Sequence, residues 1–118
     1  GVTPDILVEE ANDNFKIGVT STANKLDVLR KMLPEGTPFS VLIAPGRFEL
    51  LNDDKFYRQL RLAVITELKK RNIRFVDPFN RFKKAGYKNI HFAHDGHWTA
   101  LGHKIAAEEI AKVLKSNN

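Results

Sequence analysis

The chain has 118 residues, of which 42% are hydrophobic and 28% charged, and its formal net charge is +5. This length and composition are typical of a single globular domain, residues 1–118, and argue against two. There is no cysteine, which excludes disulfides and thiolate chemistry but leaves the cellular compartment undetermined, and no apolar run approaches the roughly 20 residues of a membrane span.

The net positive charge makes nucleic acid the first partner to consider. The basic residues do not form one interaction surface in the sequence, however. Lys69, Lys70 and Arg71 lie at the end of a predicted helix, where cations complement the helix dipole. A second group is spread through a polar connection and consists of Arg81, Lys83, Lys84 and Lys88. We therefore expect a solvated basic surface and no nucleic-acid partner.

Three short apolar segments, at residues 5–10, 39–44 and 73–76, predict β-strands. The first is followed by a cluster of turn-forming residues at 12–14, the second by Pro45-Gly46 and the third by Asp77-Pro78. Their apolar character is continuous rather than alternating. This favours strands that are covered on both faces, as in a parallel sheet.

Helical periodicity separates these strands. Apolar residues recur at helical spacing from a cap at Ser21 or Thr22 to Leu33, again over residues 54–71, and after Thr99 to the end of the chain. The order βαβαβ, a long loop and a final helix predicts an α/β fold with a three-layer parallel sheet. Open sheets of this kind bind ligands at the carboxyl ends of their strands, where we expect Asn12, Arg47 and the loop at 89–98 to converge.

The loop at residues 89–98 contains the candidate catalytic residues. All four histidines lie between residues 91 and 103, together with Asp95. Asp95 and His97 are two positions apart in the turn-forming sequence His94-Asp95-Gly96-His97, a spacing that lets the carboxylate reach the imidazole Nδ1. A carboxylate in that place fixes the tautomer of the histidine and stabilises its protonated form, so the pair is a candidate acid–base dyad.

The segment Asp95-Gly96-His97-Trp98-Thr99, followed by Gly102-His103, resembles the final conserved block of the SGNH (GDSL-type) ester hydrolases, in the branch with Asp-x-His-Trp. The resemblance implies that Asp95 and His97 are catalytic. It also implies a flavodoxin-like fold, an acyl ester substrate such as an O-acetylated carbohydrate, and no cofactor.

A second segment, residues 4–13, is similar to another block of that family, in which a strand runs into Asn-Asp. The similarity implies that Asn12 donates its side-chain amide to the oxyanion hole, a contribution on the order of 3 kcal/mol to such a reaction. The resemblance covers the second half of the family's domain, so this chain corresponds to the C-terminal portion.

The family's Gly-Asp-Ser nucleophile block is absent from the sequence. The contexts of Ser21, Ser40 and Ser116 fit a helix cap, a strand start and a chain end better than an exposed nucleophile turn. We therefore expect this chain alone to be inactive. Either the nucleophile comes from outside residues 1–118, or the domain has lost it and serves as a non-catalytic binding or interaction module.

Other interpretations of the same residues remain open. His97 could be a loop histidine that packs on Trp98, and Arg47, which could bind a substrate carbonyl or anion, could be a surface arginine. His91, His94 and His97 with Asp95 could bind zinc, but their three-residue spacing suits a helix face and Asp95-Gly96 indicates a loop, so we predict no metal. A sheet without its first strands should also leave an edge uncovered, which favours self-association or a complementing N-terminal segment.

Overall fold

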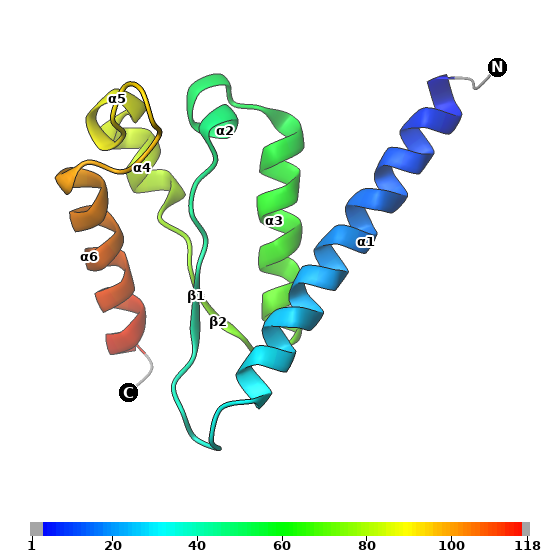
Figure 1. Cartoon of the computed structure of the whole chain (residues 1–118), viewed down its shortest axis with the longest axis horizontal. Helices are drawn as coiled ribbons and strands as arrows, with labels where there is room; N and C mark the ends of the chain where they lie inside the picture. Colours follow the sequence, from blue (N-terminus) through cyan, green and yellow to red (C-terminus); the bar gives the residue numbers. More distant parts are fainter. Residues whose placement is uncertain (1–3, 117–118) are drawn as a thin grey trace.

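The computed structural model describes residues 4–116, and the side-chain surroundings of residues 13–116. Along the chain it contains α1 (Pro4–Lys31), β1 (Ser40–Leu42), α2 (Arg47–Asn52), α3 (Lys55–Lys70), β2 (Arg74–Val76), α4 (Phe79–Ala85), α5 (Tyr87–Ile90) and α6 (Ala100–Ser116). Helices make up most of this structure (Figure 1). Within the described part, none of them combines the length and apolarity needed to cross a membrane.

The predicted three-layer parallel sheet is wrong. In the described residues the sheet contains only β1 and β2, which are parallel and pair Ser40 with Arg74 and Leu42 with Val76. The second and third predicted strands therefore exist and pair as expected. The sheet does not extend further because the first predicted strand, residues 5–10, is helical.

The long helix α1 replaces that strand and the turn that was expected after it. An apolar run as short as Ile6-Leu7-Val8 fits a strand or a buried helix equally well, and periodicity cannot separate the two. Pro4 is the first residue of α1, a position that favours proline because its missing N–H has no helical partner. Further along, Val19 and Ala23 are buried one turn apart in a helix that packs against α3. Asn12 accordingly lies inside a helix, not after a strand.

The other boundaries follow local signals in the sequence. The side chain of Asp54 caps α3 by accepting the backbone N–H of Tyr57 at 3.0 Å. After α3, Asn72 adopts a positive φ of 55°, which reverses the chain toward β2. The start of α6 is fixed by Thr99, whose hydroxyl lies 3.4 Å from the backbone nitrogen of Gly102.

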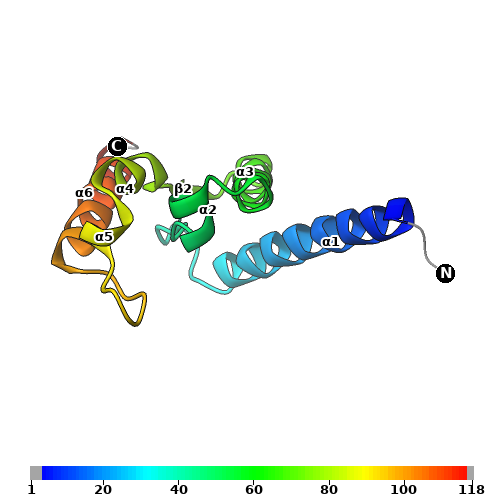
Figure 2. The same cartoon turned by 90° about the horizontal axis from the view of Figure 1, so that it is seen from above.

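The helices divide into two groups. On one side of the sheet α1 packs beside α3, and the amino-terminal part of α1 extends away from α5 and α6 (Figures 1 and 2). The other group, α2, α4, α5 and α6, gathers at the carboxyl ends of the strands and along the opposite side. Its core consists of Leu50, Phe79, Phe82, Ile90, Ile105 and Ala106. The main hydrophobic cluster thus lies between helices and supports the segment that carries the candidate dyad.

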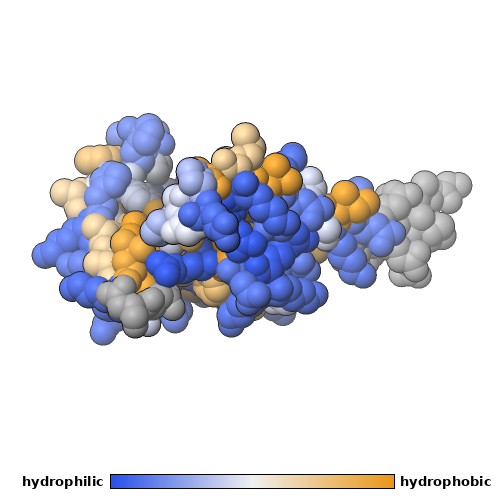
Figure 3. Space-filling view, turned by 90° about the horizontal axis from the view of Figure 1, so that it is seen from below, coloured by the Kyte–Doolittle hydropathy of each residue, from blue (hydrophilic) through white to orange (hydrophobic). Residues whose placement is uncertain are grey.

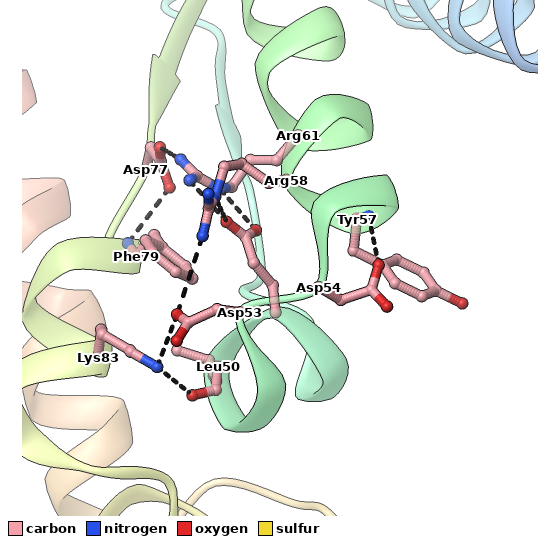
Figure 4. Close-up of polar contacts among 10 residues, drawn as sticks. Leu50, Asp53, Asp54, Tyr57, Arg58, Arg61, Asp77, Phe79 and Lys83 are labelled. Atoms are coloured by element: carbon pink, nitrogen blue, oxygen red, sulfur yellow. Dashed lines mark hydrogen bonds and ion pairs between the residues drawn. The ribbon is translucent and has the colours of Figure 1, made fainter.

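A buried ion cluster connects α2 and α3 to the end of β2. Glu49 is only 1% exposed, and Arg61 donates to both of its carboxylate oxygens at 2.8 Å. The third nitrogen of the guanidinium donates to Asp77 at 2.7 Å, and the group lies 4.1 Å from the centre of the Phe79 ring (Figure 4). The two carboxylates, with the hydrogen bond to Glu49 as the largest cause, raise the pKa of Arg61 above its ordinary value. One arginine therefore satisfies carboxylates from two separate segments.

Replacing Arg61 by methionine is expected to destabilise the fold by roughly 3–5 kcal/mol, because Glu49 would remain buried without a partner. The double variant Glu49→Leu/Arg61→Met should recover part of that loss, since it removes both charges. Arg58→Met is the matched control: Arg58 is 45% exposed and 4.0 Å from Glu49, so its loss should cost less than about 1 kcal/mol. Urea denaturation measures all three, and equal losses for Arg58→Met and Arg61→Met would contradict the assignment.

The basic residues are dispersed over several elements, and some of them form ion pairs. Arg71 lies 3.7 Å from Glu67 and 4.0 Å from Asp27, and Arg30 is bonded to Asp27 at 2.6 Å. The end of the molecule where α1 and α3 finish is mostly hydrophilic, with separate hydrophobic areas (Figure 3). These half-buried pairs neutralise part of the positive field. The arrangement fits the solvated basic surface expected from the sequence.

Candidate functional site

A hairpin between α5 and α6 carries the candidate dyad. His91 and Trp98 form an isolated antiparallel bridge, and the backbone N–H of Phe92 donates to the carbonyl of His97 at 2.9 Å. Gly96 has a φ of +71°, a conformation that glycine adopts without the steric cost of a Cβ. The turn indicated by Asp95-Gly96 is therefore present, and it places Asp95 and His97 together at the exposed tip.

Asp95 contacts His97 with both carboxylate oxygens. Oδ1 accepts the backbone N–H of His97 at 3.0 Å, and Oδ2 lies 3.2 Å from the imidazole Nδ1. These contacts, the backbone N–H first, lower the pKa of Asp95. The pairing favours the tautomer with the proton on Nδ1 and leaves Nε2 as an acceptor. The side chain of His97 is 82% exposed, so Nε2 is accessible to another molecule.

The pKa of Asp95 provides a test of this geometry. We expect it below its ordinary value in the wild-type chain, and still below it in His97→Ala, because alanine retains the backbone N–H that is the largest cause of the shift. Only the part of the pKa shift that the imidazole causes should be lost. NMR titration of the Asp95 carboxyl carbon measures both values. A complete return to the ordinary pKa in His97→Ala would mean that the backbone hydrogen bond is not formed.

Aromatic contacts anchor the base of the hairpin. The His91 ring stacks on Tyr87 at 4.0 Å between centroids, and its Nδ1 lies 3.3 Å from the Tyr87 carbonyl oxygen. The Trp98 ring makes T-shaped contacts with the rings of Phe82 and His103, at 5.2 and 5.4 Å between centroids. His91 lines the cleft with part of its ring but is only 6% exposed, and burial lowers its pKa by disfavouring the charged ring. It supports the hairpin as a neutral, packed residue.

Gly102 fixes the distance between the hairpin and α6. A Cβ at this position would lie 2.8 Å from the carbonyl oxygen of Ile90 and 3.0 Å from the Cβ of Trp98. Backbone atoms cannot rotate away from such a contact as a flexible side chain can. Glycine at this position therefore permits α6 to approach both ends of the hairpin.

Gly102→Ala should destabilise the chain by about 1–3 kcal/mol through this overpacking. Gly18→Ala is the matched control, since Gly18 is also helical but a Cβ there would meet no neighbouring element within 4 Å. That substitution should stabilise the chain by about 0.5–1 kcal/mol, the usual advantage of alanine within a helix. Thermal and urea denaturation measure both. A stabilising Gly102→Ala would show that α6 does not approach this closely.

A cleft of about 500 Å³ lies beside the dyad. The residues lining it include Asp95, His91, His94, Tyr87 and Trp98, together with Arg47 from the start of α2. The structure thus brings Arg47 into one cleft with Asp95, whose partner His97 lies at the tip of the same hairpin. Ion pairs and side-chain hydrogen bonds of Arg47 are absent among residues 13–116, so its charge is available to a ligand.

Two other expectations about the site differ from the structure. Asn12 was expected at the edge of the sheet beside the dyad, but that placement depended on a strand at 5–10, and the segment belongs to α1. The side chain of Asn12 is outside the residues whose surroundings are described. None of Ser21, Ser40 and Ser116 lines the cleft; Ser21 lies on α1, Ser40 begins β1 and Ser116 bonds the Val113 carbonyl.

The histidines do not assemble around a common point. Among the described residues there is no group of three or more His, Cys, Asp or Glu side chains arranged for a metal ion. His91 faces Tyr87 and Phe82, while His97 pairs with Asp95 and His103 contacts Trp98. Each ring has its own environment, which gives no support to the zinc hypothesis.

Sequence reasoning did not identify the roles of Tyr87, Glu49 and Arg61. The four-residue spacing of Tyr87 and His91 was a usable signal, because aromatic residues so spaced meet on one side of a helical turn. Glu49 and Arg61 lie twelve positions apart on two different helices, and no local pattern links them. No protein-family model, curated protein or solved structure shows a significant match to this chain.

Proposed function

We propose that Asp95 and His97 are the acid–base pair of a serine ester hydrolase of the SGNH type, or of an acyltransferase with the same chemistry. Their substrate would be an acyl ester, such as an O-acetylated carbohydrate. The nucleophilic serine would come from outside residues 1–118. Support comes from one observation above all: the Asp95 carboxylate contacts His97 at two points, the backbone N–H and Nδ1, while the His97 side chain remains exposed.

In the proposed reaction each group has a defined part. The serine hydroxyl attacks the ester carbonyl while Nε2 of His97 removes its proton, and the resulting imidazolium returns that proton to the departing alkoxide. Asp95 keeps the proton on Nδ1 and stabilises the imidazolium. Water then repeats the sequence on the acyl enzyme, or an acceptor hydroxyl does so in a transferase. Arg47, exposed and close to the hairpin, would bind the carbonyl or an anionic group of the substrate.

A non-catalytic binding module is the second candidate. It is favoured by the absence of serine from the cleft, since an activated hydroxyl must lie within about 3 Å of its base. On this alternative the cleft would bind an ester or anion without cleaving it. The two candidates make different predictions for a longer polypeptide that joins residues 1–118 to the segment proposed to supply the serine.

We expect that longer polypeptide to hydrolyse p-nitrophenyl acetate, and residues 1–118 alone to be inactive. In the longer form, His97→Ala should lower kcat/KM by about 10²- to 10⁴-fold, the usual contribution of general acid–base catalysis. His94→Ala is the matched control, because His94 is an exposed histidine of the same hairpin that lines the cleft. Because His94 lines the cleft, its loss should act on KM, while kcat should change little.

Several results would contradict the proposal. Equal hydrolysis by the His97→Ala and wild-type longer forms would eliminate the acid–base role. A longer form that binds the ester without turnover would favour the binding module. Turnover by residues 1–118 alone would show that the nucleophile lies within this chain, and substitution of Ser21, Ser40 and Ser116 in turn would identify it.

A further inference from the structure

A second, apolar pocket adjoins the cleft beside the dyad. Its volume is about 380 Å³, and its lining consists of Leu51, Tyr87, Lys88, His91 and Ala93. Tyr87, His91 and Ala93 also line the cleft, so the two spaces share a wall. Both volumes fall within the roughly 300–1,000 Å³ typical of small-molecule sites.

Two short helical segments face each other across these spaces. On α2, Arg47 and Leu51 are four residues apart and therefore on one face, with Arg47 at the cleft and Leu51 at the apolar pocket. On the other side, Tyr87 and His91 are also four residues apart, and their stacked rings form the wall that both spaces share. One turn of α2 thus separates a cationic end of the combined space, at Arg47, from an apolar end, at Leu51.

The apolar pocket has no anionic residue in its lining. Leu51 is 44% exposed, which leaves its side chain available to contact a ligand. Lys88 contributes a long aliphatic stem, whose ammonium group can remain in water. His91 is buried, and its lowered pKa is consistent with a neutral, weakly polar ring in that wall.

We propose that this pocket binds the aliphatic chain of a medium-length acyl group whose carbonyl or carboxylate end lies against Arg47. The cationic and apolar ends match the two ends of such a molecule. One helical turn, about 5.4 Å, accommodates roughly the first four carbons of the chain, and the pocket of about 380 Å³ has room for those that follow. The inference rests on the proposed function only in naming the ligand an acyl group. The binding site itself is independent of the nucleophile.

Octanoate and acetate are suitable probes, because both carry the carboxylate and only octanoate carries the chain. We expect octanoate to bind residues 1–118 at least about tenfold more tightly than acetate, given the free energy gained for each buried methylene. NMR shift changes should centre on Leu51, Tyr87 and Ala93. Equal binding of the two acids, or octanoate shifts confined to the pocket between α1 and α3 around Phe15 and Ala63, would overturn the proposal.

Substitutions test the apolar end and the cationic end of the proposed binding site separately. Leu51→Glu should weaken octanoate binding about tenfold or more by placing a charge in the pocket, and Leu51→Ala should weaken it less. Leu62→Glu is the matched control, because Leu62 is a leucine of similar exposure, 48%, on α3. Arg47→Gln should reduce the affinity for octanoate and acetate alike. Octanoate binding that is unchanged in both Leu51 variants would refute the assignment of the pocket.

The outcomes also separate this inference from the proposed reaction. Leu51-dependent octanoate binding, with ester hydrolysis in the longer polypeptide that does not depend on His97, would retain the acyl site and eliminate the dyad. His97-dependent hydrolysis without octanoate binding would retain the dyad and eliminate the acyl site. Methyl glucoside causing the same shifts, with no response to octanoate, would assign the aromatic wall to a sugar instead.

Discussion

The buried carboxylate of Glu49 is the constraint on which the arrangement of this molecule depends. A charge withdrawn from water requires a partner with several donors, and Arg61 supplies two of its donors to Glu49 and a third to Asp77. Glu49 belongs to α2, Arg61 to α3, and Asp77 follows β2. The position of α2 relative to the carboxyl end of β2 is therefore set by electrostatics as well as by packing. Because Arg47 and Leu51 are on that same helix, the cluster also places one wall of the cleft.

The opposite wall depends on aromatic and steric fit. A chain of ring contacts runs from Tyr87 to His91, from His91 to Phe82 and from Phe82 to Trp98. Gly102 permits α6 to pack closely against the base of the hairpin. The two walls thus have different origins, one ionic and one apolar. Each wall is supported from outside the cleft, the first by Glu49 and Arg61 and the second by Phe82 and Gly102, so the exposed side chains at its surface are free to interact with a ligand. This separation of support from contact is common at binding sites, where rigid elements position a few accessible groups.

Local signals in the sequence predicted much of this structure. Asp77-Pro78 ended a strand, Asp54 capped α3 and Thr99 preceded α6, and each follows from hydrogen bonding within a few residues. The contact between Asp95 and His97 was predictable for the same reason, because two positions in a turn determine it.

The errors arose where distant residues decide the outcome. Whether residues 5–10 form a strand or a helix depends on the continuity of α1 as far as Lys31 and on its packing against α3, which no short window contains. That one error extended the predicted sheet and placed Asn12 beside the dyad. The burial of His91 and the pairing of Glu49 with Arg61 likewise depend on contacts between separate elements. The catalytic role of the dyad stays a prediction.

The short separation between Asp95 and His97 has a consequence for how the chain acquires this pair. Closing a loop costs conformational entropy that increases with the number of residues enclosed, and here only one residue intervenes. Contacts between residues so close in the sequence form early and quickly during folding. The imidazole can therefore be oriented by its carboxylate before the walls of the cleft have assembled around it.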